Sequence, residues 1–457
     1  MAKQNTLINN LTEGPLTKQI LFFALPVVLG NLLHTIYNLV DMAVVGQFVG
    51  SAGLSAVSTS GQITILFYCL GIGLSSGGQI LIAQQVGAND RDGIRKTIGT
   101  SFTFTVLLAI VVTTIGLLSY TPLLRAMNTP AEAWNDAVQY MFWCCLGVPF
   151  TYLNGGLSAL LRGMGDSKHP TYFVGAAAIV NIVLDLLFVA VFDMRAKGAA
   201  IATSFAQFIG AAACIGYLYI NRDKLGFDFK WESFRMDRKT LSTILRLAAP
   251  LAVQVIAINI SMLFVNGWVN AYGVIVSAVN GVGTKLYSLA TVVTNAMQAA
   301  VATFTGQNIA AHRPERVKKT MWISTAFTIA FWLLATLVCI FLPRIVFELF
   351  TTEEAVLEMA PAYMRIQIVM YLSFALMSTP LGFLNGIGYV NLNLLIAIMD
   401  GVIARIGLSI LFANVLDIGP AAYWWGSALA GFVSVSWGWL YFFSGRWKNR
   451  KLLAGGE

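Results

Sequence analysis

Twelve apolar runs, each long enough to cross a lipid bilayer, set the main constraint on how this chain can fold. Crossing the ~30 Å hydrocarbon core takes about 20 residues of α-helix, which rises ~1.5 Å per residue. Hydrophobic residues make up 57% of the chain and charged residues only 11%, a composition far outside the range of soluble domains. We therefore predict an all-α integral membrane protein with twelve transmembrane helices, near residues 17–46, 53–85, 95–120, 134–161, 170–192, 197–220, 241–270, 277–308, 317–342, 356–384, 391–414 and 421–444.

The basic residues divide the loops into two sides. Loops that would share a side with both chain ends hold 22 of the 29 Lys and Arg residues, whereas the opposite loops hold four. Because cytoplasmic loops carry the excess of Lys and Arg, we expect a multi-pass protein of the cytoplasmic membrane with both termini in the cytoplasm. This distribution accounts for the net charge of +8 without a nucleic-acid partner and makes membrane lipids the partners of the basic loops. The N-terminus is polar up to about Gln19, so we expect no cleaved signal peptide.

Four motifs of the first half recur in the second half at a shift of 222–224 residues. The pairs are FFALPVVLGN with RLAAPLAVQV, LSAVSTSGQ with VSAVNGVGT, AQQVGANDR with TGQNIAAHR, and RGMGD with NGIGY. Two copies in the same orientation predict two six-helix lobes related by a pseudo-two-fold axis along the membrane normal, with a cavity between them. We expect an N-terminal lobe at 1–220, a charged cytoplasmic linker at 221–240, and a C-terminal lobe with a short cytoplasmic tail at 241–457.

Three acids lie well inside predicted spans, namely Asp41, Asp185 and Asp400. A charge at that depth costs several kcal/mol and needs a partner, yet the six N-terminal spans contain no Lys or Arg in their interiors. A carboxyl group held protonated for packing is one explanation. The C-terminal lobe differs, because three bases accompany its acid: Lys285, Arg365 and Arg405. The presence of these bases in the same lobe favours a structural ion pair for Asp400.

Polar groups gather around the two acids of the N-terminal lobe. Asn181 stands four residues before Asp185 and therefore on the same helix face, and Thr203 of the next span lies at the same depth as both acids, roughly 9–14 Å below the outer surface. Oxygen ligands without a fixed base suit a proton, a sodium ion or a cationic substrate. Neither acid recurs at the shifted positions of the second half, so we predict a cation site particular to the N-terminal lobe.

The chain resembles a multidrug and toxic compound extrusion (MATE) transporter and is closest to the prokaryotic DinF-like branch. The resemblance rests on GPLTKQILFFALPVVLGNLLHTIYNLVDMAVVG, LRGMGDSKHPTY and NIVLDLLFV, in this order before the repeated second half, and it covers almost the whole chain. It implies a proton- or sodium-coupled antiporter that exports organic, cationic or amphiphilic drugs and toxic compounds by alternating access. It also implies that the cation-coupling ligands, which would hold the metal ion if that ion is sodium, are Asp41, Asn181, Asp185 and Thr203.

Further residues are expected around this site. On the first helix Asn31 falls on one stripe with other polar residues, and Pro26 removes one backbone hydrogen bond and permits a bend, which the resemblance associates with switching. We expect no enzymatic activity, no cofactor beyond the coupling ion, small organic molecules as substrates, and function as a monomer. Six side chains are expected to line the substrate cavity: His34, Tyr37, Asn38, Tyr140, Asn154 and Gln207.

Two other functions remain open on the sequence. A lipid-linked saccharide flippase of the same superfamily would need basic residues in its cavity to bind pyrophosphate. An intramembrane aspartyl protease using Asp41 and Asp185 would leave the repeated lobe without a purpose. The string GMGD at 163–166 matches the GxGD motif of such proteases, but Arg162 and Lys168 bracket it, so we expect Asp166 in a turn at the cytoplasmic surface.

Overall fold

The computed structural model describes residues 8–450 and 452, and all the regular structure in that part of the chain is helical. The first lobe comprises α1 (Leu16–Phe48), α2 (Ser51–Gly87), α3 (Arg91–Ala126), α4 (Ala131–Gly163), α5 (Lys168–Asp185) continued by η1 (Leu186–Val191), and α6 (Arg195–Ile220). The second comprises α8 (Arg238–Asn270), α9 (Val274–Ala310), α10 (Pro314–Phe341), α12 (Glu354–Gly386), α13 (Val390–Ile398) continued by η3 (Met399–Ala404) and α14 (Arg405–Asn414), and α15 (Ala421–Phe443). Four short helices are α7 (Arg222–Leu225), η2 (Trp231–Phe234), α11 (Pro343–Glu348) and η4 (Arg446–Asn449).

The predicted transmembrane fold is confirmed. In the described part, ten of these helical segments are long and apolar enough to cross a membrane, and α9 and α15, with 37 and 23 residues, complete the set of twelve. The lobes repeat helix by helix, since α1 and α8 each have 33 residues, α2 and α9 each have 37, and α4 and α12 each have 33. A proline lies inside the first helix of each lobe, at Pro26 and Pro250.

The fifth helix of each lobe contains a π-helical segment that the sequence pattern did not predict. The segment η1 follows Asp185 directly, and η3 contains Asp400. A π-helical turn adds a residue to the helix without altering its hydropathy, so the apolar run looks continuous in the sequence. Such turns redirect neighbouring side chains and are frequent at functional sites.

The linker between the lobes ends earlier than predicted, because α8 begins at Arg238 rather than after residue 240. Asp237 caps this helix: its carboxylate accepts hydrogen bonds from the Thr240 amide at 2.8 Å and the Thr240 hydroxyl at 2.6 Å. These bonds, the hydroxyl's first, hold the pKa of Asp237 below its usual value. An N-cap carboxylate satisfies amide groups that would otherwise lack a partner in the first turn.

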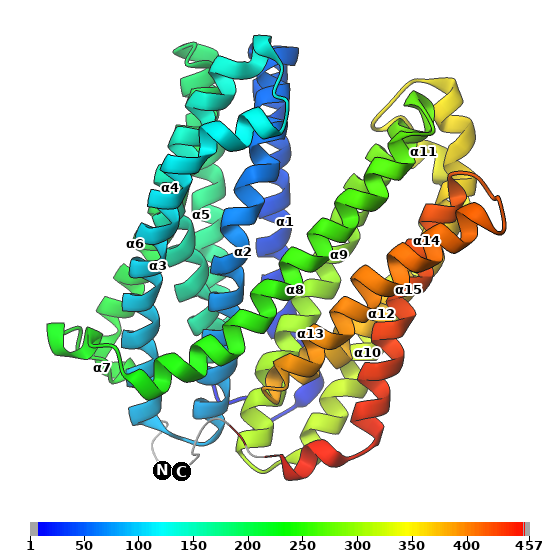
Figure 1. Ribbon diagram of the computed structural model, residues 1–457. Helices are drawn as coiled ribbons and strands as arrows, with labels where there is room; N and C mark the ends of the chain where they lie inside the picture. The colour runs from blue at the N-terminus through cyan, green and yellow to red at the C-terminus, as the bar shows by residue number, and fades with distance from the viewer. Residues whose placement is uncertain (1–7, 451, 453–457) are drawn as a thin grey trace.

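The two lobes converge toward the end of the molecule where α15 finishes and diverge toward the opposite end (Figure 1). Close packing of α2 on α8 uses two glycines: a Cβ on Gly73 would lie 2.7 Å from the Ala248 carbonyl oxygen, and one on Gly77 would lie 3.0 Å from that of Ile244. Small residues let membrane helices approach closely enough for backbone packing. Gln79 adds a hydrogen bond across the lobes, from Nε2 to the Thr303 hydroxyl at 3.0 Å.

The segment before α1 ties the two lobes together at the converging end. Its Asn9 amide donates to the Met164 carbonyl of the first lobe, and its Leu11 amide donates to Gln307 Oε1 of the second, both at 2.9 Å. Arg316 of α10 fastens the segment by donating to four acceptors at 3.0–3.1 Å: Gly14 O, Leu11 O, Gln19 Oε1 and Asn308 Oδ1. Three of those acceptors belong to the first lobe and its leading segment.

We expect Arg316→Gln to lower the free energy of unfolding of the purified protein by ~1–3 kcal/mol, because hydrogen bonds from a charged donor are lost. Thermal or denaturant unfolding in detergent measures this. Lys319→Gln is the matched control, since Lys319 is exposed on the same helix and makes the same change of charge. Equal stability of the two variants would contradict a tethering role for Arg316.

Candidate cation site

The structure buries both acids of the N-terminal lobe. Asp185 is fully buried and Asp41 is 6% exposed. Within the described residues, Asp185 Oδ1 and Oδ2 and Asp41 Oδ1 have no hydrogen-bond donor. The helices that carry them, α1 and α5, pack together. Burying two negatively charged carboxylates that have no hydrogen-bond donors costs free energy in a medium of low dielectric constant.

Asn181 and Thr203 complete the predicted set. Asn181 is fully buried, one turn before Asp185, and its Nδ2 donates to Thr203 Oγ1 at 3.3 Å. Its Oδ1 is a further buried acceptor without a donor in the described chain. The arrangement therefore presents carboxylate and amide oxygens that need a proton or a cation. It contains two acids, and the described residues hold no cluster of three or more His, Cys, Asp or Glu side chains suited to a metal.

Asp136 of α4 shows how a buried acid of the same lobe is satisfied when a base is present. It is 7% exposed, and Arg195 donates to both its oxygens, from Nη2 at 2.7 Å and from Nε at 3.0 Å. Arg195 stands at the start of α6, at the end of the span. Neither Asp41 nor Asp185 has such an ion pair among the described residues. These two acids therefore differ from Asp136 in lacking a basic partner.

Three of the predicted cavity residues join in one polar chain. Asn154 Nδ2 donates to Gln207 Oε1 at 2.8 Å, and Gln207 Nε2 donates to the Tyr37 hydroxyl at 3.2 Å. Tyr37 lies one turn before Asp41, so this chain runs from α4 through α6 to the acid-bearing face of α1. Tyr140 is buried at 7% exposure.

His34 and Asn38 lie on α1 seven and three residues before Asp41, and among the described residues no hydrogen bond links them to the polar chain. Both are exposed, and they contact each other, with 3.0 Å between Asn38 Nδ2 and His34 Nδ1. His34 also lines a pocket with Asn31, Arg162 and Thr171. Exposure is compatible with a place on the cavity wall, so that role stays a prediction for both residues.

The first helix runs unbroken across Pro26 from Leu16 to Phe48. The Pro26 carbonyl accepts a hydrogen bond from Thr171 Oγ1 of α5 at 2.6 Å, which ties the two acid-bearing helices together beside the proline. The predicted bend therefore stays a prediction about another state of the helix.

One basic residue of the second lobe lies near the site in the first lobe, which its place in the sequence did not indicate. Lys285 of α9 lies with its Nζ 4.0 Å from the sulfur of Met42, the residue next to Asp41. Its side chain is exposed and forms no ion pair among the described residues. An exposed lysine inside an apolar span is a signal for a cavity-facing position, but only the packing of the lobes reveals which helix it faces.

Asp400 contacts one of the three bases considered for it, Arg405, and also accepts a hydrogen bond from a serine. Ser434 Oγ donates to Asp400 Oδ2 at 2.6 Å, and Arg405 Nη2 lies 3.8 Å from Oδ1. The second distance is within reach of charge attraction but too long for a hydrogen bond. The other two bases considered, Lys285 and Arg365, form no ion pair with Asp400 in the described residues.

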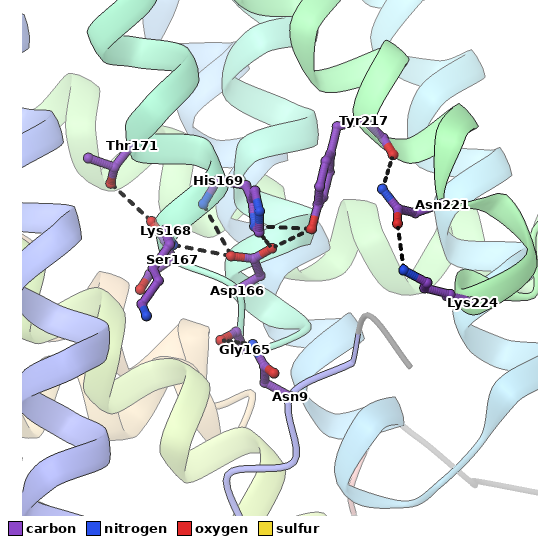
Figure 2. A network of polar contacts seen from close by, with 10 residues as sticks. All are labelled: Asn9, Gly165, Asp166, Ser167, Lys168, His169, Thr171, Tyr217, Asn221 and Lys224. Atoms are coloured by element: carbon purple, nitrogen blue, oxygen red, sulfur yellow. Dashed lines mark hydrogen bonds and ion pairs between the residues drawn. The ribbon is translucent and has the colours of Figure 1, made fainter. Parts of the chain in front are cut away.

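Asp166 has the structural role expected of it. Its Oδ1 accepts hydrogen bonds from the amides of Lys168 and His169 at the start of α5, and its Oδ2 pairs with His169 Nδ1 at 2.6 Å. Figure 2 shows Tyr217 closing this network and Asn9 docking on Gly165 beneath it. The carboxylate thus caps a helix in the turn after α4 and is bound to its own neighbours.

Two repeated six-helix lobes that meet at one end are an architecture typical of membrane transporters. The MatE family model matches residues 26–187 and again residues 250–411, so the chain belongs to the MATE family, whose members are transporters and not enzymes. The two matches also confirm the internal repeat. Assignment to the DinF-like branch stays a prediction.

Individual relatives agree with this assignment. The chain is 30% identical over 77% of its length, and 77% of the relative, to a probable multidrug resistance protein, YoeA, of Bacillus subtilis. It is 23% identical over 95% of its length, and 94% of the relative, to a probable multidrug resistance protein, NorM, of Thermotoga maritima. A solved outward-facing conformation of a multidrug resistance MATE family transporter has the same fold, with a TM-score of 0.91, 22% identity, and coverage of 99% of this chain and 100% of that one.

We expect Asp185→Asn to remove a stabilisation that sodium or acid gives the wild-type protein. A ligand that binds only the folded state raises its stability in step with its concentration, and the substitution removes one negative charge at nearly constant volume. The measurement is the melting temperature of purified protein from pH 5 to pH 9, with and without sodium.

Asp136→Asn is the control for that experiment. It breaks the pair with Arg195 and should lower the melting temperature at every condition while leaving the response to sodium or acid intact. If Asp185→Asn responds to both ions as the wild type does, Asp185 is not part of an ion site.

Asp400→Asn should chiefly lower stability or expression, because it weakens contacts with Ser434 and Arg405 inside the C-terminal lobe. Melting temperature and transport by the purified, reconstituted variant separate the two effects. A variant as stable as the wild type that fails to transport would give Asp400 a role in the mechanism instead.

Proposed function

We propose that this transporter is a cation-coupled antiporter that exports organic, cationic or amphiphilic compounds across the cytoplasmic membrane, with both termini in the cytoplasm. The observation that carries the proposal is the group of buried oxygens without donors on Asp41, Asn181 and Asp185. A permanent base would satisfy these oxygens and hold them in one state. Without one, they are free to exchange a proton or a sodium ion during each cycle.

The coupling follows from a difference in affinity between two conformations. Cation binding at Asp41 and Asp185 neutralises the repulsion between them and favours close packing of α1 on α5, whereas release of the cation favours an open, hydrated cavity. A ligand shifts such an equilibrium only by the difference in its affinity for the two states. Drug and coupling ion must therefore oppose each other, and each lowers the affinity of the other by the same factor.

The driving energy is sufficient for export. One elementary charge moving down the membrane potential releases ~2.3 kcal/mol per 100 mV, to which any concentration gradient adds. A tenfold drug gradient requires about 1.4 kcal/mol. One ion per cycle can therefore drive the outward movement of a neutral drug, whereas exchange of one ion for one monovalent cationic drug moves no net charge and is driven by the concentration gradient of the ion alone.

The nature of the cargo is inferred from relatives and from charge. The relatives named above are called multidrug resistance proteins, and an organic cation could compensate the negative charge of Asp41 and Asp185, which have no ion-pair partner among the described residues. The alternative within the superfamily is a flippase, whose cargo would be a lipid-linked saccharide. We propose that the protein acts as a monomer, because a single chain contains both lobes and all four proposed ion ligands.

We expect Asp41→Asn and Asp185→Asn each to abolish coupled export while leaving insertion into the membrane intact. Asn181→Ala and Thr203→Ala should weaken coupling less, since each removes one neutral ligand. The measurement is drug efflux from liposomes with a proton gradient or a sodium gradient imposed alone, together with the reciprocal ion flux. Wild-type efflux in either aspartate variant would overturn the mechanism.

Drug affinity should weaken as the pH falls, or as sodium is added, and this effect should shrink in Asp41→Asn. The sign follows from competition, because the protonated or sodium-bound site no longer favours the drug-binding state. Titration of a fluorescent organic cation into purified protein between pH 5 and pH 9 measures it. A drug affinity insensitive to both ions would mean that Asp41 is a neutral packing residue.

A further inference from the structure

The C-terminal lobe contains a small, partly open pocket where the repeat places the counterpart of the cation site. A shift of 224 residues, the spacing of the two family matches, carries Asn181 onto Arg405 and Thr203 onto Ser427. Arg405 and Ser427 both line this pocket of about 60 Å³, to which α8, α9, α12, α14 and α15 all contribute. The repeat thus replaces an amide and acids in one lobe with a guanidinium in the other.

The pocket presents hydrogen-bond donors that nothing in the described chain accepts. Arg405 is 5% exposed, and its Nε and Nη1 atoms have no acceptor; Trp424 is 6% exposed, and its indole Nε1 has none either. Both residues line the pocket. An arginine is always charged and can only donate, so these buried N–H groups lose hydration without compensation.

The neighbouring acid does not supply the missing acceptor. Asp400 lies 3.8 Å from Arg405 Nη2 and takes its hydrogen bond from Ser434 instead. The Nε and Nη1 atoms of the guanidinium therefore remain hydrogen-bond donors without an acceptor in the described chain. Gln367 also lines it, with Oε1 lacking a donor; rotation of that amide would present its NH2 group to a bound acceptor.

We propose that this pocket is an anion site that binds a small monovalent anion, a halide or a carboxylate group, through Arg405 and Trp424. The surrounding wall fits such a ligand. Tyr363, which packs edge-on against Trp424 with ring centroids 4.9 Å apart, adds a hydroxyl-bearing side chain to the wall. A monovalent anion matches the one partly compensated positive charge. This inference is independent of the cation site in the other lobe.

The test measures stabilisation of the purified full-length protein by potassium chloride and by potassium acetate, with potassium sulfate balancing the ionic strength. A saturable rise in melting temperature with either anion is expected, because binding to the folded state alone stabilises as the ratio of concentration to Kd grows. Chloride acting alone identifies a halide site, and acetate acting alone or more strongly identifies a carboxylate site. No saturable rise with either anion would overturn the proposal.

Four variants assign the binding to the pocket. The double variant Arg405→Gln with Asp400→Asn removes both charges of the pair, so no buried charge is left alone, and it should weaken anion binding by about tenfold or more. Trp424→Phe keeps the ring without its N–H and should weaken binding by about fivefold. Asp400→Asn alone should tighten binding, and Arg365→Gln, an exposed arginine of the same lobe, should leave it unchanged.

The outcomes separate the site from a general salt effect. Unchanged anion affinity in the double variant, or an equal loss in Arg365→Gln, would overturn the assignment. If the double variant does not fold, the two remaining substitutions decide, because the proposal requires opposite effects from Trp424→Phe and Asp400→Asn. Changes in the same direction in those two variants would also reject it.

Discussion

The constraint on which the structure depends is that a polar group inside a bilayer must find its partner within the protein. Most polar groups here do so locally. Asp136 has Arg195, and the carboxylate of Asp166 caps α5. Oxygens of Asp41 and Asp185 are among the buried atoms of the described chain that lack a partner, and no ion pair reaches either acid there. A cluster that the chain cannot satisfy by itself is suited to a ligand that comes and goes.

The sequence predicted the fold well because the bilayer leaves few choices. Apolar length specifies where each helix spans, so predicted and observed helix ends agree within a few residues except at the end of α3, which continues to Ala126. The repeat added the grouping into lobes. The π-helical segments after Asp185 and at Asp400 could not be predicted, because they change the backbone hydrogen bonds without changing the hydropathy pattern.

The candidate site was predictable only in part. Counting residues from the helix ends brought Asp41, Asp185 and Thr203 to one depth, and spacing along α5 added Asn181. Sequence spacing on one helix says nothing of neighbours from another, so the contact of Lys285 with Met42 and the polar chain from Asn154 to Tyr37 were visible only in three dimensions. Which oxygens lack donors is likewise a property of packing.

The two lobes solve the same topological problem with opposite charge. Where the N-terminal lobe holds acids without a base, the C-terminal lobe holds Arg405, only loosely compensated by Asp400. Gene duplication starts with identical halves, so the loss of both acids and the change from Asn181 to Arg405 at matched positions show that neither charge is required by the shared fold. The converging end, where Arg316 and Gln307 join the lobes through the segment before α1, then couples two lobes of different chemistry. Any movement that separates the lobes at that end must break those hydrogen bonds.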